Sequence, residues 1–464
     1  MPSQPQQPSP ESNRSPSAAS RRQFLATSSA GLAGAAISSS LATAATTSAT
    51  SDLGFEDAEI KIGLIGAGGR GRGAIANLFN AGGRVKLVAI ADAFAEKIDR
   101  AMKYITKSAE EVAEKTGVAT DALLDVPQER QFVGLDAYQQ VLATDCDLVV
   151  LATPPGFRPM HFEAAVNAGK HTFLEKPVAT DAAGVRRVLA TGKLAAEKKL
   201  AVQVGLQRRH EALYNEIMSR LHEGAIGDIV YTRVYWNSGG VWVRPRQSQQ
   251  SEMQYQVNNW YYFTWLSGDH IVEQHIHNLD VGNWLHRATP VEAHGMGGRQ
   301  TRTGKQFGQI FDHHAVEFTY PDGSKLISQC RHQRDCRSSV GEYTHGTKGR
   351  ADFKQGLIYG ADGKPIYRYK GNKREGHQQE QTDLIAALRR GEIPNECEYG
   401  AHSTMTAILG RMATYSGKEL PWDKAISSSL AVTPDDFHWD SKPPVLPDAD
   451  GNYPVPKPGK TEVI

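Results

Sequence analysis

Residues 60–71 read Ile-Lys-Ile-Gly-Leu-Ile-Gly-Ala-Gly-Gly-Arg-Gly. The first six residues have the largely apolar pattern of a short buried strand, and the next six match the spacing G-x-G-x-x-G. The apolar pattern of a helix follows over residues 74–79. Glycine spacing alone is a weak signal, but a strand, a glycine turn and a helix in this order predict the first unit of a dinucleotide-binding fold.

Each residue of the glycine turn has an expected role. Gly66 allows the tight turn, Gly68 lets the backbone approach a pyrophosphate, and Gly71 lets the helix pack closely on the strand. Gly69 and Arg70 lie between them, in the loop that would bind the cofactor. The start of the helix adds free N–H groups and the positive end of its dipole. The turn therefore predicts a site for a nicotinamide dinucleotide.

Asp92 is the residue expected to select the cofactor. It ends the next predicted strand, residues 85–91, and lies 21 positions after Gly71. Its carboxylate would accept hydrogen bonds from the adenine ribose hydroxyls and repel a 2′-phosphate, which favours NAD. Arg70 and Arg72 could neutralise an additional phosphate, so NADP stays open as an alternative.

The rest of the chain predicts two folded domains and a tail. Further strands at residues 147–152 and 171–174 alternate with helical stretches such as residues 160–168, which is typical of a doubly wound parallel sheet. After residue 204, longer alternating segments, aromatic clusters and turn signals favour a large, mostly antiparallel sheet with a few helices. We predict an α/β Rossmann domain at residues 59–204, an α+β domain at residues 205–430, and a Pro-rich tail at residues 431–464 that wraps over the surface or frays.

The N-terminal segment, residues 1–45, resembles a twin-arginine export signal. Arg21 and Arg22 precede an uncharged stretch rich in Ala, Ser, Gly and Thr, which is too polar for a convincing membrane span. We therefore expect a periplasmic or secreted protein without stable membrane insertion. The alternative is a disordered N-terminal tail with arginines placed by chance.

Composition narrows the class of protein. Hydrophobic residues make up 40% and charged residues 22%, as in ordinary soluble globular proteins. The formal net charge is +1, removal of residues 1–45 would leave about −1, and no block of Lys and Arg follows. Nucleic acid is therefore an unexpected partner. The four cysteines form no zinc-like cluster, and spacing leaves a Cys330–Cys336 disulfide open.

Three motifs in the first domain carry a family resemblance. They are Ala152-Thr153-Pro154-Pro155, Asn167-Ala168-Gly169-Lys170-His171 and Leu174-Glu175-Lys176-Pro177. With the glycine turn, they are similar in order and spacing to the Gfo/Idh/MocA oxidoreductases. The resemblance implies that Thr153, Pro154 and Glu175 line the cofactor site, and that Lys176 lies beside the nicotinamide ring and the reacting hydroxyl. A surface lysine in a turn is the alternative for Lys176.

A second constellation lies at residues 268–280. At helical spacing, His270, Glu273, His277 and Asp280 would share one face. The resemblance implies that an acidic residue and a histidine four positions later contact the substrate, with Glu273 here where Asp is usual. His277 would take the hydroxyl proton, Lys176 would share that charge, and His270 would contact the substrate. The His-x-x-Glu-x-x-x-His pattern is no established metal motif, so we expect no metal.

Further substrate contacts are less specific. Arg209 follows a segment that resembles the start of the family's second domain, and a structural salt bridge is an equally good interpretation of it. Trp236, Trp242 and Trp260 could stack on the C–H faces of a sugar, although large aromatic residues more often belong to a core. Of the three, we expect Trp260 to bind substrate.

These features predict an NAD-dependent dehydrogenase that oxidises a secondary hydroxyl of a sugar, polyol or glycoside, with the cofactor held tightly. A redox-neutral glycosidase that oxidises its substrate transiently would use the same residues. A non-catalytic sugar-binding or scaffolding protein is a third alternative, although Lys176 and His277 are both present. The resemblance also implies a homo-oligomer.

Overall fold

A computed structural model describes residues 55, 57–372, 375–434 and 436–464. The predicted export signal at residues 1–45 lies outside the described residues. None of the helices in the described part of the chain combines the length and the apolar character needed to cross a bilayer.

The first sheet has six parallel strands in the order β3-β2-β1-β4-β5-β6. They are β1 (Ile60–Ile65), β2 (Val85–Asp92), β3 (Gln131–Val133), β4 (Leu148–Leu151), β5 (His171–Leu174) and β6 (Val202–Val204). The connecting helices are α1 (Gly69–Asn80), α2 (Ala95–Thr116), α3 (Thr120–Leu123), α4 (Ala137–Leu142), α5 (Arg158–Asn167) and α6 (Ala182–Glu197). The predicted doubly wound Rossmann architecture is confirmed.

Both faces of this sheet are buried, and β4 shows why its sequence is apolar throughout. Leu148 and Val150 belong to the cluster that contains residues of α1 and α2, whereas Val149 and Leu151 belong to the cluster on the other face, with α5 and α6. Side chains of a strand alternate between faces, so a strand covered on both sides must be apolar at every position.

The second sheet has nine strands in the order β14-β13-β12-β11-β7-β10-β9-β8-β15, and only β7 and β10 pair in parallel. They are β7 (Ile229–Ser238), β8 (Glu292–Gly298), β9 (His313–Thr319), β10 (Lys325–His332), β11 (Ser339–Gly346), β12 (Gly349–Asp352), β13 (Leu357–Gly360), β14 (Pro365–Arg368) and β15 (Leu420–Pro421). The predicted mostly antiparallel sheet is confirmed. β9 alternates buried and partly exposed residues along its length, because one face of the sheet carries helices.

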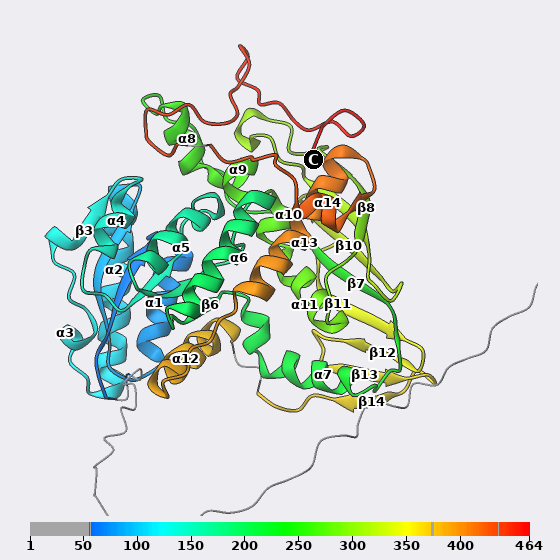
Figure 1. Ribbon diagram of the computed structural model, residues 1–464, viewed down its shortest axis with the longest axis horizontal. Coiled ribbons are helices and arrows are strands. Elements are labelled where there is room, and N and C mark those ends of the chain that lie inside the picture. Colours follow the sequence, from blue (N-terminus) through cyan, green and yellow to red (C-terminus); the bar gives the residue numbers. More distant parts are fainter. Residues whose placement is uncertain (1–54, 56, 373–374, 435) are drawn as a thin grey trace, which may run out of the picture. The chain divides into compact units, whose positions relative to one another are not determined.

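The helices that follow β6 are α7 (Ala212–His222), α8 (Glu252–Asn258), α9 (Thr264–Ser267), α10 (His270–Glu273), α11 (Ile276–His286), α12 (Gly376–Arg389), α13 (Cys397–Ser416) and α14 (Trp422–Ile426). α13 is buried along nearly its whole length and packs against α6 of the first layer as well as β8 and α11 of the second (Figure 1). A helix that is buried on all sides has neighbours all round, and its polar residues need partners within the fold.

α12 returns from the second half of the chain to the first sheet. It packs against α1, and its Leu384, Ile385 and Leu388 join the core cluster of β1 and β2 (Figure 1). Residues 52–464 cluster as one unit by contacts. The domain boundary at residue 204 therefore stays a prediction.

The Pro-rich C-terminal segment packs on the protein. The ring of Phe437 lies 5.1 Å from that of Phe157, and the ring of Trp439 lies 5.5 Å from that of Phe94. In Figure 1 the segment, in red, passes over the top of the view beside α8. The structure also has all four cysteines as free thiols, with Cys330 buried and Cys336 exposed.

Candidate active site

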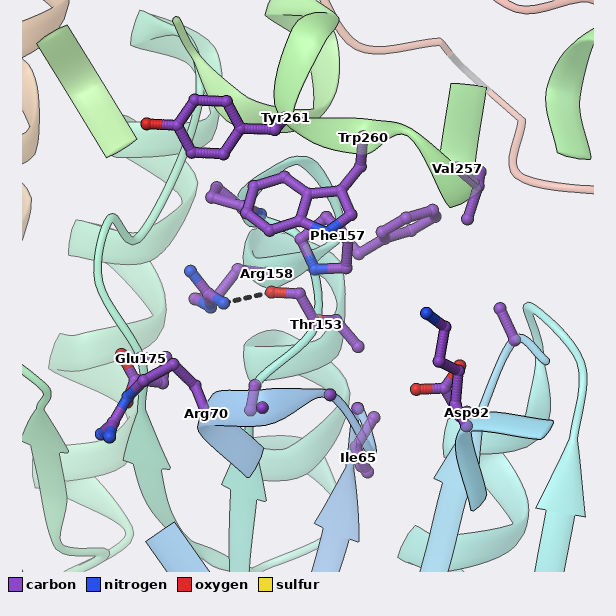
Figure 2. A pocket seen from close by; sticks show the side chains of 18 of the residues that line it. Ile65, Arg70, Asp92, Thr153, Phe157, Arg158, Glu175, Val257, Trp260 and Tyr261 are labelled. Atoms are coloured by element: carbon purple, nitrogen blue, oxygen red, sulfur yellow. Dashed lines mark hydrogen bonds and ion pairs between the residues drawn. The ribbon is translucent and has the colours of Figure 1, made fainter. Parts of the chain in front are cut away.

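A cavity of about 490 Å³ lies at the carboxyl ends of the strands of the first sheet. The glycine turn and Asp92 form its floor, and Val257, Trp260 and Tyr261 lie across from them (Figure 2). Open parallel sheets bind ligands at this edge, where the chain crosses from one face of the sheet to the other. The cavity thus joins the predicted cofactor residues to side chains from the second half of the chain.

The glycines of the turn divide into two pairs with different tasks. At Gly66, where φ is +100°, a Cβ atom would lie 2.6 Å from the backbone of Ala152, and at Gly71 it would lie 2.0 Å from the carbonyl oxygen of Gly66. At Gly68 and Gly69 a Cβ atom would meet nothing within 4 Å. The first pair lets the chain pack, whereas the second pair leaves space in the cavity wall for a ligand.

The start of α1 suits phosphate groups. The helix begins at Gly69, no side chain caps it, and its first turn has no acidic residue. The first N–H groups of such a helix lack partners within the helix and attract anions. The open Cβ positions and this uncapped helix start therefore fit a dinucleotide pyrophosphate.

Asp92 lies in the cavity wall and is tied to the backbone of the turn. Its carboxylate accepts hydrogen bonds from the N–H of Ala67 at 2.8 Å and the N–H of Phe94 at 3.1 Å. Burial raises the pKa of Asp92 to about 6, and the two N–H donors oppose that shift. The carboxylate is therefore ionised at neutral pH and titrates close below it.

Arg70 lines the cavity, but its guanidinium is already paired with carboxylates. Its guanidinium donates to Oε1 of Glu175 at 2.6 and 2.9 Å and lies 3.5 Å from Glu380 (Figure 2). Arg72 stacks over the ring of Tyr104 at 4.9 Å. Arg70 was a reason to leave NADP open, and its pairing with Glu175 weakens that reason.

Glu175 is buried in the wall of the cavity, as predicted from the family motif. Burial would raise its pKa, but the charges of Arg70, Lys176 and Arg158 outweigh that effect and lower the pKa. Thr153 and Pro154 also line the cavity, as predicted from the family motif, and the carbonyl oxygen of Thr153 accepts a hydrogen bond from Arg158 (Figure 2). The motif residues thus form one connected wall.

Lys176 and Glu273 meet in the cavity. The Nζ of Lys176 donates to the carboxylate of Glu273 at 3.0 Å and to its backbone carbonyl at 2.5 Å. The two side chains are 10% and 13% exposed, and both line the cavity. The alternative that Lys176 is a surface lysine in a turn is wrong, because its side chain is mostly buried in the cavity wall. Its partner Glu273 lies 97 positions away in the sequence and is brought into contact by the fold.

His277 lies near this pair but not in the cavity lining. It is 6% exposed, its ring stacks on Trp236 at 6.0 Å, and its Nδ1 atom has no hydrogen-bond partner. Burial, and then the charge of Lys176, hold the pKa of His277 well below its usual range. The imidazole is therefore neutral.

The predicted single helix face at residues 268–280 is wrong. Gln274 and His275 separate α10 from α11, so the four polar residues point into different surroundings. His270 is fully buried beside Asp269 and does not line the cavity, and Asp280 pairs with Arg209.

Arg209 likewise does not line the cavity that contains the glycine turn. Its guanidinium donates to Asp280 at 2.8 and 3.0 Å and stacks on Tyr399 at 4.0 Å. The salt-bridge interpretation of Arg209 is the one that the structure supports, because its charge is already neutralised inside the fold.

The aromatic segment lies opposite the glycine turn. Trp242 and Trp260 pack edge to face at 5.8 Å, and both line the cavity with Tyr261. Sequence reasoning did not select Tyr261, or His161 in the helix that follows the Thr-Pro-Pro motif. The position of His161, six residues after Pro155 and in the first turn of α5, was the signal that could have identified it.

Comparison with known proteins agrees with this geometry. Residues 60–206 match the model of a family described as an oxidoreductase family with an NAD-binding Rossmann fold, which confirms the predicted cofactor class. Inositol 2-dehydrogenase 4 of Saccharopolyspora erythraea is 32% identical over 36% of this chain and 43% of its own. A glycosyl hydrolase family 109 protein of Shewanella amazonensis is 28% identical over 46% of this chain and 44% of its own. The chain thus spans less than half the length of these relatives.

The fold extends beyond the matched domain. The crystal structure of scyllo-inositol dehydrogenase from Lactobacillus casei with bound NAD(H) and scyllo-inositol matches with a TM-score of 0.57 at 20% identity. The match covers 79% of this chain and 99% of that one. At this identity the likeness is one of fold, and it includes the second sheet.

Proposed function

We propose, from the match of residues 60–206 to the model of the Gfo/Idh/MocA family of NAD-binding oxidoreductases, that this chain oxidises a secondary hydroxyl of a sugar or polyol. One observation carries the proposal. The Lys176–Glu273 pair lies in the wall of the same cavity that the glycine turn and Asp92 line. An acid–base pair beside a dinucleotide site is what hydride transfer from an alcohol requires.

The residues in and beside the cavity have separate roles in the proposed reaction. A bound nicotinamide supplies the hydride acceptor. Lys176 holds the substrate hydroxyl by a hydrogen bond, passes a proton to the carboxylate of Glu273, and takes the hydroxyl proton in its place. His277 was expected to take the hydroxyl proton directly, but it does not line the cavity, so we assign its neutral imidazole the role of next acceptor, since its Nδ1 atom has no hydrogen-bond partner. Trp242 and Trp260 offer apolar faces for the C–H groups of a sugar ring.

The direct test begins with the protein as purified. The full chain is denatured, released dinucleotide is identified by mass, and the native protein is screened against inositols, aldoses and glycosides for a change in nicotinamide absorbance. We expect bound NAD, held tightly, and reduction of the cofactor by at least one polyol or sugar. A preparation that never binds NAD or NADP would remove the enzymatic proposal.

A redox-neutral glycosidase is the second candidate. The similarity to the glycosyl hydrolase family 109 protein supports it, because transient oxidation followed by elimination would use the same Lys176 and Glu273. The two functions differ in their products. A dehydrogenase accumulates a ketone or reduced cofactor, whereas the glycosidase releases an aryl leaving group from an aryl glycoside with no net change in nicotinamide absorbance.

We also propose export and self-association, both expected from the sequence. Replacing Arg21 and Arg22 by Lys should retain the protein in the cytoplasm, as fractionation would show.

For the homo-oligomer, the second sheet offers exposed apolar side chains, among them Met296 on β8 at 77% exposure and Ile366 on β14. Light scattering coupled to size exclusion measures the mass in solution.

Cofactor affinity should depend on pH through Asp92. The ionised carboxylate accepts from ribose hydroxyls, so NAD should bind more weakly as the pH falls through the pKa of about 6, and affinity should be level above it. The linkage sets the slope at up to about tenfold in Kd per pH unit below that pKa. Titration calorimetry with NAD between pH 5 and 8 measures this. Asp92→Asn is the matched control and should give a flat profile, so an equal slope in both proteins would exclude Asp92 as its source.

The C-terminal segment should help retain the cofactor. Phe437 and Trp439 pack on Phe157 and Phe94, and both of these line the cavity. Replacing Phe437 and Trp439 by Ala should therefore speed the loss of NAD on dialysis, about tenfold for each 1.4 kcal/mol of lost binding energy. His438→Ala is the control, because that side chain is exposed. Equal retention in both variants would contradict a role for the segment.

A further inference from the structure

A second cluster of ionisable groups lies behind the cavity, at the start of α10. Asp269, His270 and His314 are each fully buried, and one potential ligand atom from each lies within 4.8 Å of the other two. None of the three lines the cavity. We refer to these three residues as the Asp269 cluster, and the proposed reaction does not use them.

The two oxygens of Asp269 have different partners. Oδ2 accepts from the N–H of Phe311 at 3.0 Å and the hydroxyl of Tyr415 at 2.6 Å. Oδ1 accepts from the backbone N–H of His270 at 2.5 Å and also faces two imidazoles, with Nδ1 of His270 at 2.8 Å and Nε2 of His314 at 3.3 Å. Within the described residues, no Lys or Arg forms an ion pair with this carboxylate. Arg299 and Arg411 interact with its charge only at longer range, so a further cation in direct contact with the carboxylate would stabilise it.

The tautomer of His314 indicates the position of such a cation, between the ring of His314 and the carboxylate of Asp269. Thr414 has a single hydroxyl hydrogen and donates it to the carbonyl oxygen of Arg411 at 3.0 Å. The Nδ1 of His314, 2.8 Å from the same hydroxyl oxygen, must therefore be the donor there. A neutral His314 then presents a bare lone pair on Nε2, which is buried and makes no hydrogen bond. Two acceptors, Nε2 and Oδ1, face each other across 3.3 Å.

We propose that the Asp269 cluster binds a divalent transition-metal ion of the zinc type. Oδ1 of Asp269, Nδ1 of His270 and Nε2 of His314 are the protein ligands. Two imidazoles and one carboxylate are a donor set that such ions prefer. The hydrogen bond from His314 to Thr414 is the outer contact that fixes the tautomer of a metal-bound histidine.

The ion would have a structural role. Asp269 has φ +76° and ψ 163°, a backbone region that favours glycine and is strained for a residue with a side chain. Metal ligation offsets that strain and ties the first turn of α10 to β9, which carries His314. α10 ends at Glu273, so the site fixes the carboxylate that holds Lys176.

The test measures metal content and stability rather than activity. The full chain is purified without an affinity tag or chelator and analysed by mass spectrometry of its elements. We expect about one equivalent of metal, a lower Tm after treatment with a strong chelator, and recovery of the Tm with Zn²⁺. Co²⁺ added to the stripped protein should produce visible absorption bands, a readout that needs no variant.

Two variants on the same strand sharpen the result. His314→Gln keeps a hydrogen-bonding side chain of similar length and should reduce the metal content at least tenfold. His313→Gln is the control, because His313 is 39% exposed, bonds to Asp312, and should leave the metal in place.

Wild-type protein that stays metal-free after dialysis with Zn²⁺, gives no Co²⁺ bands and melts unchanged with chelator would overturn the proposal. The NAD content of the same samples is measured separately, so failure of this site and failure of the dehydrogenase proposal are distinguishable.

Discussion

Lys176→Met should lower kcat by about 10³-fold while NAD still binds, because acid–base groups typically contribute about 10²–10⁴-fold to a rate. Methionine fills the space of the lysine stem but cannot hold the substrate hydroxyl or pass a proton to Glu273. Steady-state kinetics with the best substrate from the screen, together with calorimetry for NAD, separate the two effects.

Two comparisons make this result specific. Glu273→Gln keeps a hydrogen-bond acceptor for Lys176 but removes the charge that receives the proton, so we expect a loss of about 10²-fold in kcat, again within the range for acid–base groups. Lys193→Met, on the exposed side of α6, should change neither rate nor affinity. If Lys176→Met keeps kcat within threefold of the wild type, the pair in the cavity is not the catalytic group.

Gly68→Ala should abolish tight NAD binding without destabilising the protein. The new Cβ atom meets nothing within 4 Å of protein, and the backbone at Gly68 has φ −70°, which alanine adopts freely. The methyl group would instead occupy the space assigned to the pyrophosphate. We expect the Kd for NAD to rise by about 100-fold, equivalent to about 2.8 kcal/mol, with the Tm of the cofactor-free protein unchanged.

Gly71→Ala is the matched variant with the opposite outcome. Its Cβ atom would lie 2.0 Å from the carbonyl oxygen of Gly66 and 3.1 Å from Leu64, so the helix and the strand must move apart. We expect a clear loss in Tm for this variant even without NAD. Calorimetric melting and NAD titration of both proteins test the pair, and equal melting losses in both would mean that the open space at Gly68 is not a ligand site.

Much of the first domain was predictable because its strands, turns and helices follow one another directly along the sequence. Ile60–Ile65 forms β1 and Gly69–Asn80 forms α1, because an apolar strand, a glycine turn and an apolar helix follow one another without any distant partner being needed. The motif at Lys176 likewise follows β5 directly. Residues that a short motif places at the end of a strand could therefore be assigned to the cavity from the sequence.

The errors arose where distant residues compete for the same group. Helical spacing joined His270 to His277 on one face, but a positive φ at Asp269 and the break at Gln274 turn those side chains into separate surroundings. Spacing also did not show that Arg70, which lines the cavity, pairs with Glu175, or that Arg209 pairs with Asp280, because these carboxylates lie 105 and 71 positions away. The partner of a buried arginine is the carboxylate that folding brings close to it. The sequence next to the arginine does not show which carboxylate that is.

The sequence by itself determined the parallel sheet, the glycine turn, and the assignment of Lys176 and Glu273 to the active site. Each of these predictions depends on a pattern of residues within a short stretch of the chain. Only the tertiary structure decided that Lys176 pairs with Glu273 across 97 positions, that α12 returns to the first sheet, and that Asp269 meets His314. Those contacts form because the burial of apolar surface packs α13 against α6 on one side and against β8 and α11 on the other. This packing brings distant charged groups together in the protein interior, where a charge without a partner is unfavourable.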